Sequence, residues 1–282
     1  MKTSTSLMLG LAAWLLANPG SVVAAEAEEL SPRVRSGAPL SSDFLIVSGG
    51  FNRVSSGPAG GVTSLDWVHL SGNGKTYTTG AEAHSVGDNR WAFARLSSPL
   101  FEIDRFESRI GASIGGGKTA GERFPYQIYH ASASYQATHQ FYLTLSEQYL
   151  RLGEARGHLI KPGVTIFLNP RLTTELSFAR SIGGNIQTQL VSGRLDLAGR
   201  PAGFFGGVVI GHTSPEIVRI GFGNETPGQR MREAYFGIRF RFREIEWTVV
   251  ADFPDLGTNR QQIYTVGMKL PLRRNRRVHH EK

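Results

Sequence analysis

Residues 234–253 read AYFGIRFRFREIEWTVVADF and alternate between apolar and polar side chains. Side chains that alternate with a period of two lie on the two opposite faces of a β-strand. This pattern predicts a strand over residues 234–242 with two unlike faces. Its apolar face carries Ala234, Phe236, Ile238, Phe240 and Phe242, and its opposite face carries Tyr235, Gly237, Arg239 and Arg241.

The alternation changes phase at Arg243 and Glu244. A two-residue turn at this point pairs Phe242 with Ile245 and keeps both apolar rows on one side of a hairpin. A third alternating segment follows at residues 261–272. The end of the chain is therefore predicted to be an antiparallel sheet.

The apolar rows of this sheet are rich in aromatic residues, and each covers about nine residues, which is enough to cross a bilayer as a tilted strand. The opposite face carries arginines, which suit a water-filled interior. The last segment also resembles the C-terminal signal by which bacterial outer-membrane barrels are recognised for assembly, with leucine as its final residue. The signal residues are Thr265, Gly267, Leu270 and Leu272. We therefore predict an all-β fold, a transmembrane antiparallel up-and-down β-barrel.

Alternating segments continue through most of the chain and predict about 14 strands, or about 12 if residues 75–98 fold differently. The connections between them tend to alternate between short turns and longer loops, as expected for periplasmic turns and outer loops. The expected strands cover residues 43–53, 62–71, 75–85, 90–98, 105–115, 124–136, 140–151, 158–168, 172–182, 186–196, 203–213, 232–242, 245–253 and 261–272.

The N-terminus has the features of a secretory signal peptide, with Lys2 as its charge and residues 7–17 as its short apolar core. An exported chain of alternating strands predicts the outer membrane of a Gram-negative bacterium. The chain contains no cysteine, which excludes disulfide bonds and thiol chemistry. The expected organisation is a signal peptide at residues 1–25, a periplasmic lead-in at 26–41, the barrel at 42–272 and a basic C-terminal tail at 273–282.

The formal net charge of +8 at pH 7 favours polyanionic partners. For an exported barrel these are lipopolysaccharide phosphates, other outer-membrane lipids and acidic glycans rather than nucleic acid. A second interpretation is that arginine and lysine simply occupy the two headgroup boundaries of the bilayer. The barrel-assembly machinery and periplasmic export proteins are further expected partners.

A row of charged residues lies on the predicted inner face of the last hairpin. One interpretation is a charged constriction that selects anions. The other is a cross-strand ladder of salt bridges that fills the interior, because the register sets Arg241 directly across from Glu246. The residues of the row are Arg239, Arg241, Arg243, Glu246 and Asp252.

His130 and Ser132 are the one candidate pair for nucleophilic catalysis. The His-x-Ser spacing resembles the sites of outer-membrane phospholipase and lipid A deacylase, in which the histidine activates the serine. In this chain the alternation turns both side chains inward, away from lipid. We therefore expect no catalytic residues, no metal site and no cofactor.

Three regions of the chain resemble the YaiO-like outer-membrane barrels. They are the segment at residues 49–52 with Trp67, the aromatic-rich middle at residues 126–152, and the segment at residues 221–225. The resemblance is diffuse and covers about residues 42–272. It implies an outer-membrane barrel tied to the cell envelope or to surface-polysaccharide export.

These observations leave three functional hypotheses open. The first is a passive, porin-like pore or an export component for surface polysaccharide or small anionic solutes. The second is an outer-membrane enzyme that modifies lipid or glycan. The third is a plugged structural barrel that scaffolds periplasmic export machinery.

Overall fold

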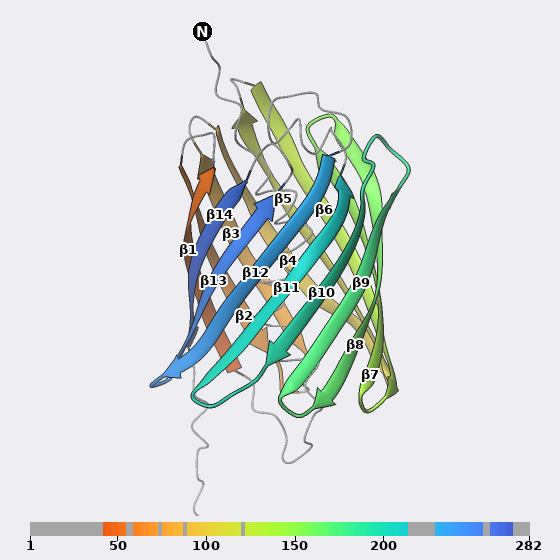
Figure 1. Cartoon of the computed structure of the whole chain (residues 1–282), viewed down its shortest axis with the longest axis vertical. Helices are drawn as coiled ribbons and strands as arrows, with labels where there is room; N and C mark the ends of the chain where they lie inside the picture. The colour runs from red at the N-terminus through yellow and green to blue at the C-terminus, as the bar shows by residue number, and fades with distance from the viewer. Residues whose placement is uncertain are drawn as a thin grey trace, which may run out of the picture.

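The computed structural model shows a closed barrel built only of β-strands (Figure 1). It describes residues 42–54, 59–72, 75–86, 89–119, 122–213, 229–255 and 260–272. The predicted signal peptide, lead-in and basic tail lie outside the described residues.

Fourteen strands form the barrel, as the alternating sequence predicts. The alternative with fewer strands is excluded, because the segment in question forms β3 and the first part of β4, which pair with each other. The strands are β1 (Ser42–Val54), β2 (Gly60–Leu70), β3 (Thr76–Val86), β4 (Asn89–Ile103), β5 (Phe106–Thr119), β6 (Glu122–Thr138), β7 (Phe141–Leu152), β8 (Ala155–Asn169), β9 (Leu172–Ile182), β10 (Gln189–Leu197), β11 (Ala202–Thr213), β12 (Gln229–Phe242), β13 (Ile245–Asp255) and β14 (Gln261–Pro271).

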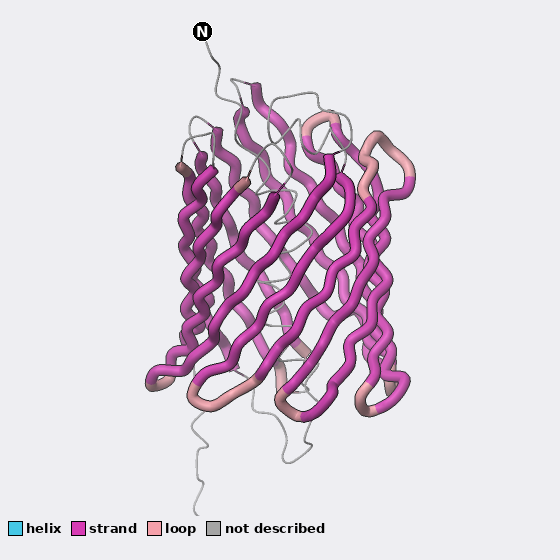
Figure 2. Tube along the Cα trace, viewed as in Figure 1, coloured by secondary structure: helices cyan, strands magenta, loops and turns pink. Residues whose placement is uncertain are grey.

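Every strand pairs antiparallel with its neighbours in the chain, and β14 pairs with β1 to close the barrel. At this seam Gly267 is the Cα partner of Ser48. The amide of Leu272, just past β14, donates a hydrogen bond of 2.8 Å to the carbonyl of Asp43. Figure 2 shows the strands running obliquely around one continuous wall.

The last hairpin has the predicted register, with Phe242 opposite Ile245. Arg243 occupies the turn with a positive φ of 58°, which allows the chain to reverse within two residues. The side chains of Phe236, Ile238 and Phe240 lie on the outer face of the barrel and are exposed. Period-two alternation therefore does separate an apolar outside from a more polar inside.

Apolar side chains exposed on the outer face occur on strands all around the wall, as a lipid environment requires. The described residues contain no helix that is long and apolar enough to cross a membrane. Inward positions alternate with these exposed ones along each strand, and they form the inner wall of the barrel.

Candidate functional site

The inner wall is apolar over the strands β4 to β8, in the half of the barrel that lies toward the connections β3–β4, β5–β6 and β7–β8. Alternate residues of these strands point inward and are buried, and we call them the apolar patch. The rings of Phe93 and Tyr126 stack at a centroid distance of 4.5 Å, and His84 stacks on Trp91 at 4.7 Å. The apolar patch consists of Trp91, Phe93, Tyr126, Ile128, Leu150 and Leu159.

Toward the opposite end the inner wall is rich in hydroxyl groups. Ser132 lies across from Ser146, and Ser134 lies across from Thr144. Further around the wall, hydroxyl groups bond to each other in the pairs Ser177–Ser192 at 2.5 Å and Ser48–Ser64 at 2.6 Å. The inner wall is therefore apolar toward one end of the barrel and neutral and polar toward the other.

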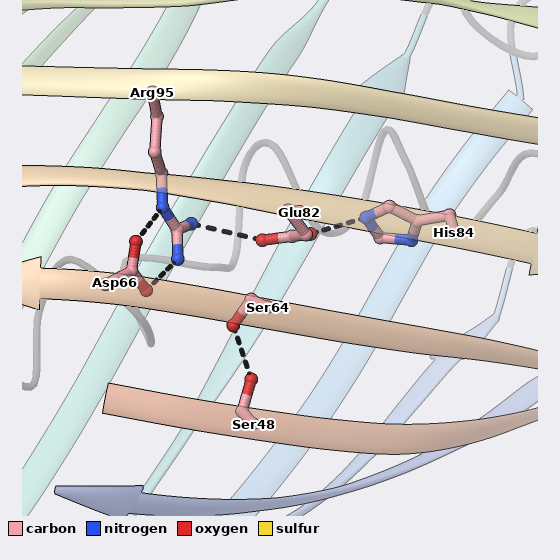
Figure 3. Close-up of polar contacts among 6 residues, drawn as sticks. All are labelled: Ser48, Ser64, Asp66, Glu82, His84 and Arg95. Carbon is pink, nitrogen blue, oxygen red and sulfur yellow. Dashed lines mark hydrogen bonds and ion pairs between the residues drawn. The ribbon is translucent and has the colours of Figure 1, made fainter. Parts of the chain in front are cut away.

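A buried ion-pair network occupies the inner wall at β2, β3 and β4 (Figure 3). The Arg95 guanidinium donates through Nε to Asp66 Oδ1 at 2.5 Å and through Nη2 to Asp66 Oδ2. Its Nη1 donates to Glu82 Oε2 at 3.1 Å, and the other oxygen of Glu82 pairs with His84 Nε2. A buried charge is stable only when it is paired, so these contacts must be kept in the folded barrel. They link the three neighbouring strands β2, β3 and β4.

The network depends on a glycine between its two main partners. Gly80 is the register partner of both Asp66 and Arg95, so it separates them on the intervening strand. A Cβ atom at this position would overlap the Asp66 carboxylate and would lie 2.5 Å from the carbonyl oxygen of Leu65. The missing side chain is what lets the ion pair cross β3.

The residues of the predicted charged row do not form one continuous ladder of salt bridges, because they contact different partners. Arg239 donates to Asp196, which lies two strands away on β10, rather than to an acid of the last hairpin. Arg241 lies opposite Glu246 at 3.9 Å, with its side chain 67% exposed. Arg243 lies in the turn, outside the strands.

Asp196 also accepts a hydrogen bond of 3.1 Å from Arg194 on its own strand. The two guanidinium groups lie over the ring of Phe205, at 5.0 Å for Arg194 and 5.2 Å for Arg239. The Phe205 ring covers Gly237, where a Cβ would overlap it. This second network differs from the first, because the intervening strand β11 places Phe205 rather than a glycine opposite Asp196, and Gly237 lies on β12 beneath the Phe205 ring.

Asp252, the last member of the row, lies near another carboxylate. It interacts electrostatically with Glu233 on β12. Both carboxylate oxygens of Glu233 and Oδ1 of Asp252 are buried without a hydrogen-bond partner. Gln261 and Asn52 on the adjoining strands also have buried oxygen atoms without a partner. This part of the wall is polar but unsatisfied, in contrast to the two arginine networks.

His130 and Ser132 both lie on the inward face of β6, as the alternation indicates. The His130 ring covers Gly111 of β5, where a Cβ would overlap it. In the described part of the chain, no group of three or more metal-ligating side chains comes together.

Sequence reasoning missed the central residues of both networks, namely Arg95, Asp66, Glu82 and Asp196. The signal that could have found them is parity, since each occupies an inward position of an alternating strand. Once the register is assumed, Asp66 and Arg95 both lie opposite Gly80, at inward positions of the strands on either side of it. An acid and a base separated in this way by a glycine predict an ion pair across the middle strand.

No known family profile matches the sequence, and no curated protein matches it. Solved structures do match the fold. A structure described as the CymD monoaromatic hydrocarbon channel superposes with a TM-score of 0.56 at 10% identity, covering 97% of this chain and 96% of that chain. The TodX deltaS2S3 mutant monoaromatic hydrocarbon channel gives 0.57 at 9% identity, covering 95% and 96%. The outer-membrane protein Omp33 of Acinetobacter baumannii gives 0.50 at 6% identity, covering 82% and 98%.

The class of protein follows from the closed wall, its apolar outer face and these matches. The chain has the porin-like fold of the outer-membrane β-barrels of Gram-negative bacteria, and it is located in that membrane. At these identities the matches show the fold alone.

The glycine between Asp66 and Arg95 gives a direct test of the buried network. We expect Gly80→Ala to lower the stability of the barrel by on the order of 3 kcal/mol, because it forces a buried ion pair apart or shifts the wall. Urea unfolding in detergent micelles measures the change. Gly49→Ala is the matched control, since its new Cβ would meet no atom closer than the Val62 carbonyl at 4.0 Å. Equal effects of the two substitutions would contradict the role given to Gly80.

Proposed function

We propose that the protein is a passive diffusion channel of the outer membrane for small organic solutes that carry an aromatic ring. The observation that carries this proposal is the apolar patch on the inner wall, followed by the hydroxyl-rich wall toward the other end. The names of two structures with the same fold, both monoaromatic hydrocarbon channels, support the same class of solute.

The side chains of the apolar patch are almost fully buried, so a ring would bind by displacing the atoms that cover them. The apolar surface that the ring then removes from water stabilises by about 25 cal/mol per Å². The stacked rings of the patch, such as Phe93 on Tyr126, also offer the offset or edge geometry that aromatic pairs prefer. Beyond the patch the solute meets hydroxyl groups such as those of Ser132 and Ser146, which bind a ring weakly. A site that binds first and then releases is what passive conduction requires.

The finer hypotheses from the sequence remain alternatives to this proposal. Surface-polysaccharide export is supported by the resemblance to YaiO-like barrels and by the hydroxyl-rich part of the wall. Passage of small anions is supported by the exposed guanidinium of Arg241. A plugged scaffold needs only the polar interior.

Swelling of proteoliposomes compares these hypotheses directly. We expect phenyl β-glucoside to enter faster than the smaller methyl β-glucoside, because only the phenyl compound can bind the apolar patch. Faster entry of the methyl compound would contradict the aromatic preference. Equally fast entry of a long oligosaccharide would favour polysaccharide export, and no swelling with any solute would favour the plugged scaffold.

Two substitutions at one residue show whether the apolar patch causes the preference. Trp91→Ala removes a ring from the patch and should reduce the ratio of phenyl to methyl entry. Trp91→Phe keeps a ring and should retain most of the ratio. Melting temperatures of both variants show whether either effect comes from loss of folding.

In the charged row of the last hairpin, we expect Arg239 to stabilise the barrel and Arg241 to affect ion selectivity. We expect Arg239→Ala to lower the melting temperature, because it removes a partner of Asp196. We expect Arg241→Ala to leave the melting temperature unchanged and to lower the preference for anions over cations in planar bilayers. The reason is that the charge of Arg241 is exposed and its ion pair with Glu246 is long at 3.9 Å. Unchanged reversal potentials in Arg241→Ala would count against a charged constriction.

A further inference from the structure

Basic side chains gather on the outer face of β4 to β9. They lie at the end of the barrel that carries the connections β3–β4, β5–β6, β7–β8 and β9–β10. All six are exposed, and each alternates along its strand with residues that face the lumen. We call this set the basic rim. It consists of Arg90, Lys118, Arg123, Arg151, Arg156 and Arg180.

The register sets these charges directly against one another. Lys118 is the Cα partner of both Arg90 and Arg123, so three basic residues lie on three consecutive strands. Arg151 is the partner of Arg156 on the next pair of strands. Like charges directly opposite each other on a sheet destabilise it, so the arrangement calls for a counter-charge.

The described part of the chain does not supply that counter-charge. None of the six side chains forms an ion pair or hydrogen bond there. On the same face, the Glu147 carboxylate hydrogen-bonds to His158 at 2.8 Å. Glu154 lies in the turn between Arg151 and Arg156. The lumenal arginine Arg95, by contrast, is bound to two carboxylates.

The basic rim lies just beyond the apolar belt of the barrel. The rings of Tyr129 and Tyr149 form an outward pair at 6.3 Å, closer to the middle of the wall than Arg151. Exposed Ile114 on β5 and Leu176 on β9 lie in the same belt. Tyrosines of this kind mark the level of the lipid headgroups, so the arginines lie at or just above that level.

We propose that the basic rim is a binding site for the phosphate groups of lipopolysaccharide in the outer leaflet. Guanidinium groups bind phosphate with two parallel hydrogen bonds, and paired arginines can hold one phosphate between them. Acyl chains of the same molecule would lie against the apolar belt below. A free phosphate ion would use the charges but not that belt, which is why the surface fits an anionic lipid.

The affinity of the intact barrel in detergent for diphosphoryl lipid A tests the proposal. We expect Arg151→Gln combined with Arg156→Gln to weaken binding of diphosphoryl lipid A about 30-fold, because each of the two basic residues contributes about the same factor to the affinity for an anionic lipid surface. Arg151→Lys with Arg156→Lys keeps both charges but loses the bidentate geometry, so it should bind with intermediate affinity. Heat-modifiable gel mobility shows that each variant is folded.

The matched control replaces exposed arginines at the other end of the barrel, Arg105→Gln with Arg171→Gln, and should leave the affinity unchanged. Equal weakening by the control would show general charge attraction and overturn the site. Unchanged binding by the rim variant would overturn it as well. Binding of inorganic phosphate with the same dependence on Arg151 and Arg156 would replace the lipid with a free-anion site.

Discussion

Backbone hydrogen bonding is the constraint on which this structure depends. The hydrocarbon interior of a bilayer has no water to satisfy peptide groups, so a spanning sheet can have no free edge. The chain meets this requirement by pairing β14 with β1. Once the wall is closed, each alternating strand must turn one face to lipid and the other to the lumen, which explains the exposed apolar belt and the polar interior together.

The interior of a closed wall limits the size of the side chains that fill it. This barrel places glycines beneath the largest or most strongly paired side chains, with Gly80 under the Asp66–Arg95 pair and Gly237 under Phe205. At Gly80 the missing side chain lets a buried ion pair cross the intervening strand β3. The first charged network and the apolar patch meet at β3 and β4, where His84 pairs with Glu82 and stacks on Trp91.

Much of the fold could be predicted from sequence because a period of two is a local property. The alternation in residues 234–242 and the two-residue turn after it specify a hairpin without any knowledge of the rest of the chain. The partner of Arg239 could not be found in this way. Asp196 lies on a strand that is not its neighbour, so the contact depends on two successive registers, on the room left by small residues and on side-chain direction.

The seam offers the most direct measurement of the central claim, which is closure of the wall by β1 and β14 in one register. A Cβ built at Gly267 lies 3.6 Å from the Cβ of Ser48, within the range of a disulfide, and the native chain has no cysteine. The account predicts that Ser48→Cys with Gly267→Cys forms a disulfide in the folded barrel, seen as a reductant-sensitive change in gel mobility after denaturation. A disulfide that forms only in the shifted pair, Ser48→Cys with Lys269→Cys, would contradict the register, and no disulfide in either pair would contradict the closed wall.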